Sequence, residues 1–245
     1  MNIPIVNRQK DLITKMIDES NLNENFIEIG CGDGHNLEKF SIMGMKGTGI
    51  DFSEETIKIG KEKKLKNIQI KEGDLFEIEE KNVGLVFLLF VLEHILNDNA
   101  ALQKINSIQR IGGYLILSVP AHKKSYSMQD KLAGHFRRYN KSDLINILHK
   151  SGYEIEVIWS FGFPICNIYT YLYNTLLFFY NKELSINTRE TKNVGIQAYN
   201  AHFPKIIRPL SGGLFKILSF LIRMDFLFLN TDLGTHYLVL AKKVN

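Results

Sequence analysis

The sequence contains few of the residues on which several common sites depend. Of its 245 residues only two are cysteine, Cys31 and Cys166. Two cysteines this far apart do not suggest a disulfide framework, and they cannot supply the three ligands of a radical-type iron–sulfur centre. The cysteine content therefore fits a reducing compartment, and we expect a cytoplasmic protein.

Long hydrophobic runs are also missing. The opening stretch MNIPIVNRQKDLITKM has no apolar segment of the kind that a secretory signal carries. The very apolar stretch Leu214–Leu229 is interrupted by Lys216, Arg223 and Asp225. A membrane-spanning helix needs about 20 mainly apolar residues, so the sequence predicts neither a secretory signal nor a transmembrane helix.

The sequence does contain a strand, a glycine-rich turn and a helix start in one short stretch. Phe26–Ile29 is mostly apolar, as in a buried parallel strand, and Gly30, Gly32 and Gly34 follow at alternate positions. Glycine accepts a positive φ and has no Cβ that would hold off a ligand. A nucleoside-bearing ligand can therefore lie against this backbone.

Two cofactor classes use such a turn. The dinucleotide pattern G-x-G-x-x-G fails in both registers, because its third glycine position holds His35 or Leu37. The observed form, with Glu28 two residues before the first glycine, resembles motif I of class I S-adenosylmethionine (SAM) dependent methyltransferases. An ordinary glycine-rich turn stays open as the alternative, since one glycine motif is weak evidence.

Further acidic residues lie where a SAM cofactor needs them. Asp51 ends the next predicted strand about 20 residues after the first glycine, where a carboxylate accepts hydrogen bonds from ribose hydroxyls. Gly73–Phe76 resembles the family motif in which Asp74 binds the adenine amino group and Leu75 borders the ring. The resemblance implies SAM as cofactor, with S-adenosylhomocysteine (SAH) as product. The implied cofactor-binding residues are Glu28, Gly30, Gly32, Asp51, Phe52, Asp74, Leu75 and Phe90.

The alternation of strands and helices predicts an α/β fold. Five apolar strands alternate with helices up to Val119, which implies a doubly wound, mostly parallel sheet. The resemblance adds a sixth and a seventh strand, paired antiparallel at one edge, and thus a seven-stranded Rossmann-like methyltransferase fold. We expect residues 1–245 to form one domain, in which 160–234 are a helical insertion that covers the acceptor side.

Three finer expectations concern single segments. We expect a helix from Asn97 to Arg110, ended by Gly112-Gly113. Residues 121–140 should form a loop. The insertion should contain one amphipathic helix between Ile165 and Tyr180 and a second over Leu214–Leu229.

Two more motifs follow predicted strand ends. Leu92–Ile95 (LEHI) and Gly134–Tyr139 (GHFRRY) resemble signatures of a methyltransferase subgroup often linked to bacterial surface glycans or lipids. A hydroxyl acceptor benefits from a base with a pKa near neutrality, which histidine provides. We predict His135 as the first candidate base and His94 as the second. Glu93 and Tyr139 complete the predicted catalytic set, and the alternative is that these histidines are structural.

The basic segment after Pro120 predicts an anionic acceptor. Arg137 and Arg138 can each bind a phosphate or carboxylate through two parallel hydrogen bonds. We therefore expect a sugar phosphate, a nucleotide-linked sugar or an acidic glycan precursor, with His122 and Tyr126 also lining the acceptor site. The alternative is that one arginine pairs with a carboxylate of the fold, such as Asp143.

No metal site is predicted. A related quinone-pathway group of methyltransferases carries an extra glutamate three residues before its Glu-His pair, and here that position holds Phe90. Glu93 and His94 alone provide too few ligands for a divalent cation.

Three functions stay open at this point. The first is an O-methyltransferase acting on a small-molecule or glycan acceptor, and the second is a lipid or quinone methyltransferase at the membrane surface. The third is a SAM-binding scaffold without turnover. Peripheral membrane contact would use Phe215, Phe220 and Phe226 with Lys205, Arg208 and Arg223.

The insertion offers a surface for a homodimer. Nucleic acid is not expected, because the net charge of +4 is only mildly basic and the N-P-P-Y tetrapeptide of amino-directed DNA methyltransferases is absent.

Overall fold

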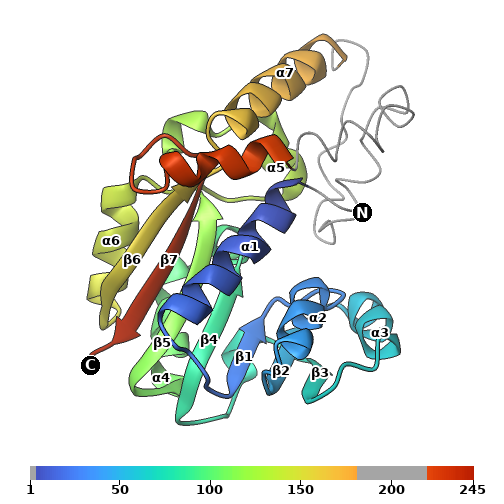
Figure 1. Cartoon of the computed structure of the whole chain (residues 1–245), viewed down its shortest axis with the longest axis vertical. Coiled ribbons are helices and arrows are strands. Elements are labelled where there is room, and N and C mark those ends of the chain that lie inside the picture. Colours follow the sequence, from blue (N-terminus) through green and yellow to red (C-terminus); the bar gives the residue numbers. More distant parts are fainter. Residues whose placement is uncertain (1–3, 181–219) are drawn as a thin grey trace.

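A seven-stranded sheet forms the centre of the protein (Figure 1). The structure is a computed structural model that describes residues 4–180 and 220–245. The strand order is β3-β2-β1-β4-β5-β7-β6, and β7 runs antiparallel to both of its neighbours. This confirms the predicted mostly parallel sheet. The strands are β1 (Phe26–Ile29), β2 (Gly47–Asp51), β3 (Ile68–Glu72), β4 (Val83–Leu89), β5 (Gln109–Pro120), β6 (Tyr153–Phe161) and β7 (His236–Lys243).

Helices cover both faces of the sheet (Figure 1). One face packs against α1 (Pro4–Glu19), α2 (His35–Ile42) and α3 (Glu54–Glu62), and the other against α4 (Asp98–Ile108) and α6 (Lys141–Lys150). Single 3₁₀ turns connect several strands to the next helix. They are η1 (Leu75–Glu77), η2 (Leu92–His94) and η3 (Lys123–Ser125).

The central strand β4 shows why the chain folds in this way. Its side chains alternate between the two hydrophobic cores, so that Leu85 and Phe87 face the α1–α2 side and Val86 and Leu88 face the α4–α6 side. A continuous apolar run is what a strand with two buried faces requires. The carboxyl ends of β1 to β5 all meet at one edge, which brings the residues after each strand together.

The expected helix from Asn97 to Arg110 is shorter than predicted. Helix α4 ends at Ile108, and β5 already begins at Gln109, whose buried amide donates to the Tyr114 carbonyl. Gly112 has a positive φ within the strand, and a Cβ on Gly113 would lie 2.9 Å from the Arg110 carbonyl oxygen. These glycines therefore allow an irregular, closely packed backbone near the start of β5, and they do not end α4.

The segment after β5 is more ordered than the expected loop. It contains η3 and a short helix, α5 (Met128–Ala133). Ser127 and Asp130 form a reciprocal capping box at the start of α5. This local signal was present in the sequence as Ser-x-x-Asp.

The insertion between β6 and β7 is described in part. Its described elements are α7 (Ile165–Tyr180), as predicted, and a 3₁₀ turn, η6 (Ile222–Leu227), where the second helix was expected to end. Residues 181–219 lie outside the described ranges, and with them Phe215, Lys205, Arg208 and the start of that second helix. None of the helices in the described ranges is long and apolar enough to cross a membrane.

Candidate functional site

The glycine turn joins β1 to α2 and leaves open space on its outer side. The backbone N–H groups of Gly30 and Cys31 both donate to the Ile50 carbonyl, at 2.8 and 3.1 Å. Gly32 has a φ of +53°, and a Cβ placed on it would meet no atom within 4 Å. A ligand can therefore approach the bare backbone at Gly32, as predicted for a nucleoside cofactor.

Asp51 supports this turn from the end of β2. One carboxylate oxygen accepts from the Gly32 N–H at 2.8 Å, and the other accepts from the Ser53 N–H at 2.9 Å. A carboxylate has about four lone-pair positions, so each oxygen keeps one for a further donor. Asp51 is thus held in place with acceptors left for ribose hydroxyls, and the neighbouring Phe52 side chain is 73% exposed.

Glu28 lies behind the turn and not in the open space. Its side chain is 1% exposed, and its Oε1 accepts from Asn36 Nδ2 at 2.8 Å. Burial raises the pKa of this carboxyl to about 8. The contact with Asn36 holds α2 against β1. Contact of Glu28 with the cofactor stays a prediction.

Asp74 and Leu75 are the residues that were predicted to contact the adenine. Asp74 follows β3, and its Oδ1 accepts from the Phe76 N–H at 2.7 Å, which caps η1. The Leu75 side chain is packed in the hydrophobic core with Ile78, so its contact with the adenine ring stays a prediction. The next side chain, Phe76, is 49% exposed.

A second group of polar residues lies where β4 ends. Glu93 and His94 belong to η2, and His135 follows α5, so the three come from segments about 40 residues apart that β4 and β5 bring to one edge. The Phe136 N–H donates to the Glu93 carbonyl at 2.8 Å, which docks the two segments. The rings of His94 and His135 are 4.7 Å apart and meet edge to face.

Asp130 orients His135. This carboxylate is buried, lies 2.9 Å from His135 Nδ1, and accepts from Arg138 Nε at 2.8 Å and the Ser127 N–H at 2.8 Å. Burial alone would raise the pKa of Asp130, but His135 and Arg138 outweigh it and leave the pKa at about 2. The ionised carboxylate fixes His135 with Nδ1 as the donor, which leaves Nε2 to act as base or ligand.

Two of the three residues of η2, Glu93 and His94, have shifted pKa values. Burial raises the pKa of Glu93 to about 8, and neither of its carboxylate oxygens has a hydrogen-bond partner among the described residues. His94 keeps an exposed edge, yet the surrounding protein atoms and the nearby His135 lower its pKa. Both groups therefore favour their neutral forms near pH 7.

The structure gives both predicted acceptor arginines partners in the protein. Arg138 is buried between Asp130 and the Ala121 carbonyl, and Arg137 contacts Asp98 at 2.6 Å and the Leu96 carbonyl at 2.6 Å. This agrees with the alternative of arginines paired with carboxylates of the fold, although Asp143 pairs with Lys123 instead.

The other predicted side chains have structural contacts. Tyr139 is buried and donates its hydroxyl to Asp98 at 3.0 Å, and burial followed by Asp98 raises its pKa well above the usual range, so it is not a candidate base. Tyr126 donates to the His135 carbonyl at 2.8 Å. His122 lies 2.9 Å from the Gly234 carbonyl through Nε2.

Sequence reasoning missed two residues near this group. Asp130 was visible only as the single acid in a basic segment, and nothing in the sequence linked it to His135. His236 starts β7, and its ring lies 5.1 Å from that of Phe90; burial and then Arg138 and His135 lower its pKa to about 3. His236 comes close to Arg138 and His135 because β5 and β7 pair, which places Pro120 opposite His236.

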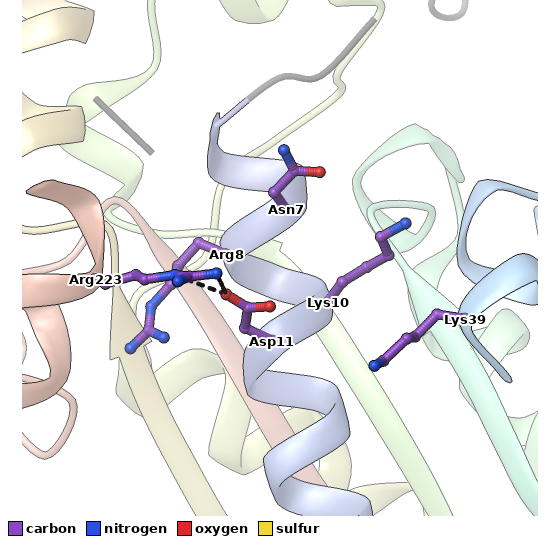
Figure 2. A pocket seen from close by; sticks show the side chains of 6 residues that line it. All are labelled: Asn7, Arg8, Lys10, Asp11, Lys39 and Arg223. Atoms are coloured by element: carbon purple, nitrogen blue, oxygen red, sulfur yellow. Dashed lines mark hydrogen bonds and ion pairs between the residues drawn. The ribbon is translucent and has the colours of Figure 1, made fainter. Parts of the chain in front are cut away.

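A separate hollow of about 250 Å³ lies on the α1 side (Figure 2). It is lined by Asn7, Arg8, Lys10 and Asp11 of α1, Lys39 of α2 and Arg223 of η6. Arg223 pairs with Asp11 across it at 3.0 Å. None of the predicted site residues lines this hollow.

Comparisons with known proteins agree with the geometry. Residues 6–157 match the sequence profile of a family described as methyltransferase domain. A demethylmenaquinone methyltransferase of Staphylococcus aureus (strain MRSA252) is 28% identical over 118 residues, which are 43% of this chain and 49% of that protein. The chain therefore matches about half the length of this curated relative.

Two solved structures share the fold. A putative sarcosine dimethylglycine methyltransferase from Galdieria sulphuraria has a TM-score of 0.63 at 13% identity, covering 97% of this chain and 86% of that one. The magnesium protoporphyrin IX methyltransferase from Synechocystis PCC 6803, solved with SAH bound, has a TM-score of 0.52 at 20% identity, covering 62% and 74%. Because the family profile matches more than half of the sequence, this chain belongs to the methyltransferase domain family.

Proposed function

We propose that the chain transfers the methyl group of SAM to an oxygen atom of a small acceptor, with the acceptor oxygen placed beside His135. The observation that carries this proposal is the Asp130–His135 pair, 2.9 Å apart, at the edge of the sheet that also carries the glycine turn. The fold alone does not decide a reaction, so the proposal rests on these residues.

The cofactor site fits SAM. SAM is the cofactor, and when bound it supplies a methyl group on a positively charged sulfur. Gly32 offers uncovered backbone, Asp51 offers oriented acceptors for the ribose, and Asp74 is the candidate partner of the adenine amino group.

The two groups of residues are physically connected. A Cβ on Gly30 would lie 2.4 Å from Cγ2 of Val91, and Val91 directly precedes η2 with Glu93 and His94. The cofactor turn and the histidine group are thus separated by a single packed side chain and the 3₁₀ turn that follows it. Holding acceptor and donor in one frame is the main contribution that a protein makes to this type of displacement.

His135 is the proposed proton acceptor. Asp130 keeps its imidazole in the tautomer with a lone pair on Nε2, and Arg138 keeps Asp130 ionised. An acceptor hydroxyl bonded to Nε2 would pass its proton there as its oxygen attacks the methyl group.

An anionic compound is the first candidate acceptor. Because Arg137 and Arg138 have protein partners, an anionic acceptor would depend on Lys124 and Lys131, which are exposed and have no carboxylate partner within the described residues. A lipid or quinone acceptor is the second candidate. It is favoured by exposed apolar side chains on α7 and η6 and by the name of the Staphylococcus aureus relative. These side chains are Ile168, Tyr171, Leu172, Phe226 and Leu227.

Replacement of His135 tests the catalytic assignment. His135→Gln should lower kcat by about 10²–10⁴ while SAM affinity is retained, because only the proton acceptor is lost. His149→Gln is the matched control. His149 is exposed and lies in the last turn of α6, where the chain leads to the start of β6. SAH formation with candidate acceptors is the readout, and unchanged turnover of His135→Gln would show that His135 is not the base.

A further inference from the structure

The side chains of Glu93, His94 and His135 form the most closely spaced ligand group in the described part of the chain. Each offers one ligand atom, and these atoms all lie within 4.8 Å of one another. Ligands at about 2.1 Å from a metal ion lie up to about 4.2 Å apart, so small side-chain rotations would close the group around one ion. Within residues 4–180 and 220–245 no other trio of His, Cys, Asp or Glu comes this close.

Glu93 gives a second and independent indication of a bound cation. Its side chain is 0% exposed, and both carboxylate oxygens lack a hydrogen-bond partner among the described residues. A buried carboxylate without donors is costly, and native proteins normally pair such groups or bind them to metal ions. A cation shared by the three side chains would give this carboxylate a partner and would accept a lone pair from each imidazole.

Asp130 supplies the outer contact that a metal-binding histidine usually has. Metal-ligating histidines almost always donate their other ring N–H to a carboxylate or carbonyl. Here His135 Nδ1 faces Asp130 Oδ1 at 2.9 Å, and Asp130 is itself held by Arg138 and Ser127. His135 Nε2 is thereby directed as the ligand atom, before any ion is bound.

We propose that Glu93, His94 and His135 bind a divalent transition-metal ion such as Zn²⁺. Two imidazoles and one carboxylate suit this class of ion, and three protein ligands leave a position for a water or an acceptor oxygen. The single sequence motif Glu93-His94 could not predict the site, since its third ligand comes from the segment after α5.

This inference rests on the proposed function and changes one step of it. With an ion on Nε2, His135 no longer takes a proton. The acceptor hydroxyl would instead bind the ion, which lowers its pKa, and it would lose its proton to solvent before its oxygen attacks the methyl group. Binding of the ion itself does not depend on turnover.

Metal titration of the whole chain tests the proposal. The chelator-treated protein should bind one equivalent of Zn²⁺ by calorimetry, and Co²⁺ should give a visible absorption spectrum that Zn²⁺ abolishes. Glu93→Gln and His135→Gln should each lower Zn²⁺ affinity at least 100-fold, and Asp130→Asn by about 10- to 100-fold. His149→Gln should bind as the unchanged chain does.

The results separate the proposed metal site from the proposed methyl transfer. Absence of binding to the folded, unchanged chain overturns the metal site, as does binding that Glu93→Gln and His135→Gln leave intact while circular dichroism shows them folded. SAH formation by the chelated enzyme would also show that the base role of His135 survives without an ion. Zn²⁺ binding without any SAH formation would keep the site and refute the proposed methyl transfer.

Discussion

The Asp51 carboxylate holds the glycine turn and is the proposed partner of the cofactor ribose. Its oxygens accept from the Gly32 and Ser53 N–H groups and keep further lone pairs. We expect Asp51→Ala to weaken SAM binding by about 1.5–3 kcal/mol, as for loss of a charged hydrogen bond. Calorimetric titration with SAM measures this, and a melting curve of the free variant separates lost contact from a disordered turn. Unchanged SAM affinity would remove Asp51 from the site.

Glu28 makes a prediction about pH. Burial, only partly offset by Asn36, raises its pKa from 4.5 to about 8 in the folded chain. Below pH 4.5 the carboxyl is protonated in both states, so it costs nothing; between pH 4.5 and 8 the unfolded chain ionises first, and the folded state loses stability relative to it.

Glu28→Gln removes this dependence and keeps the acceptor for Asn36. Its stability relative to the unchanged chain should therefore rise from pH 5 to pH 8, with an upper limit of about 5 kcal/mol. Urea unfolding at several pH values measures the difference. A difference that is constant over this range would show that Glu28 is ionised in the fold.

At the residue scale, the sequence predicted where residues lie in the fold better than it predicted which side chains are accessible to a ligand. Gly32 and Asp51 are where the motif placed them, because the turn and its supporting acid are local to β1 and β2. Leu75 was assigned to the cofactor and Tyr139 to catalysis, and both side chains are buried in the protein. Burial depends on what packs from distant segments, and motif spacing does not contain that information.

At the element scale, α1 is attached to η6 by two ion pairs that differ in burial. Arg8 contacts Asp225 at 2.5 Å, and Asp225 is 0% exposed and also accepts from the Gly162 N–H. Arg223 contacts Asp11 at 3.0 Å with both side chains largely exposed (Figure 2). The chain thus provides a matched comparison between two pairs that join the same two elements.

Breaking the buried pair should be far more costly. Asp225→Ala leaves the Arg8 charge buried and the Gly162 N–H without an acceptor, so we expect a loss of about 3–5 kcal/mol in the free energy of unfolding. Arg223→Ala should change it by less than about 1 kcal/mol, because the exposed pair is screened by water. Denaturant unfolding of both variants gives the comparison, and equal losses would contradict the assigned burial.

Elements were predicted well where one periodic signal dominated. Strand β1 and helix α7 have strong local patterns, and their predicted ranges, Phe26–Ile29 and Ile165–Tyr180, are those observed. The start of β5 was missed, because Gln109 and Arg110 continue a helical pattern and only their pairing beside Val83 makes them a strand. Pairing across the sheet is a property of the fold and not of the segment.

At the scale of the whole molecule, the strand order places the two groups of candidate site residues on one edge. The glycine turn follows β1, and Glu93 and His94 follow its neighbour β4, so sheet register alone sets them side by side. Family and cofactor could be inferred from the sequence for this reason. The acceptor could not, because His135 and Asp130 reach the site through α5, and the insertion residues 181–219 lie outside the described ranges.

The most direct test of the account is transfer of a labelled methyl group. The purified chain is incubated with deuterium-labelled SAM and candidate acceptors, both anionic sugars and quinone lipids, and SAH and labelled product are quantified by mass spectrometry. We predict SAH formation together with a product that carries the label on oxygen, and loss of both in His135→Gln but not in His149→Gln. A label found on carbon or nitrogen, or SAM binding without SAH from any acceptor, would contradict it.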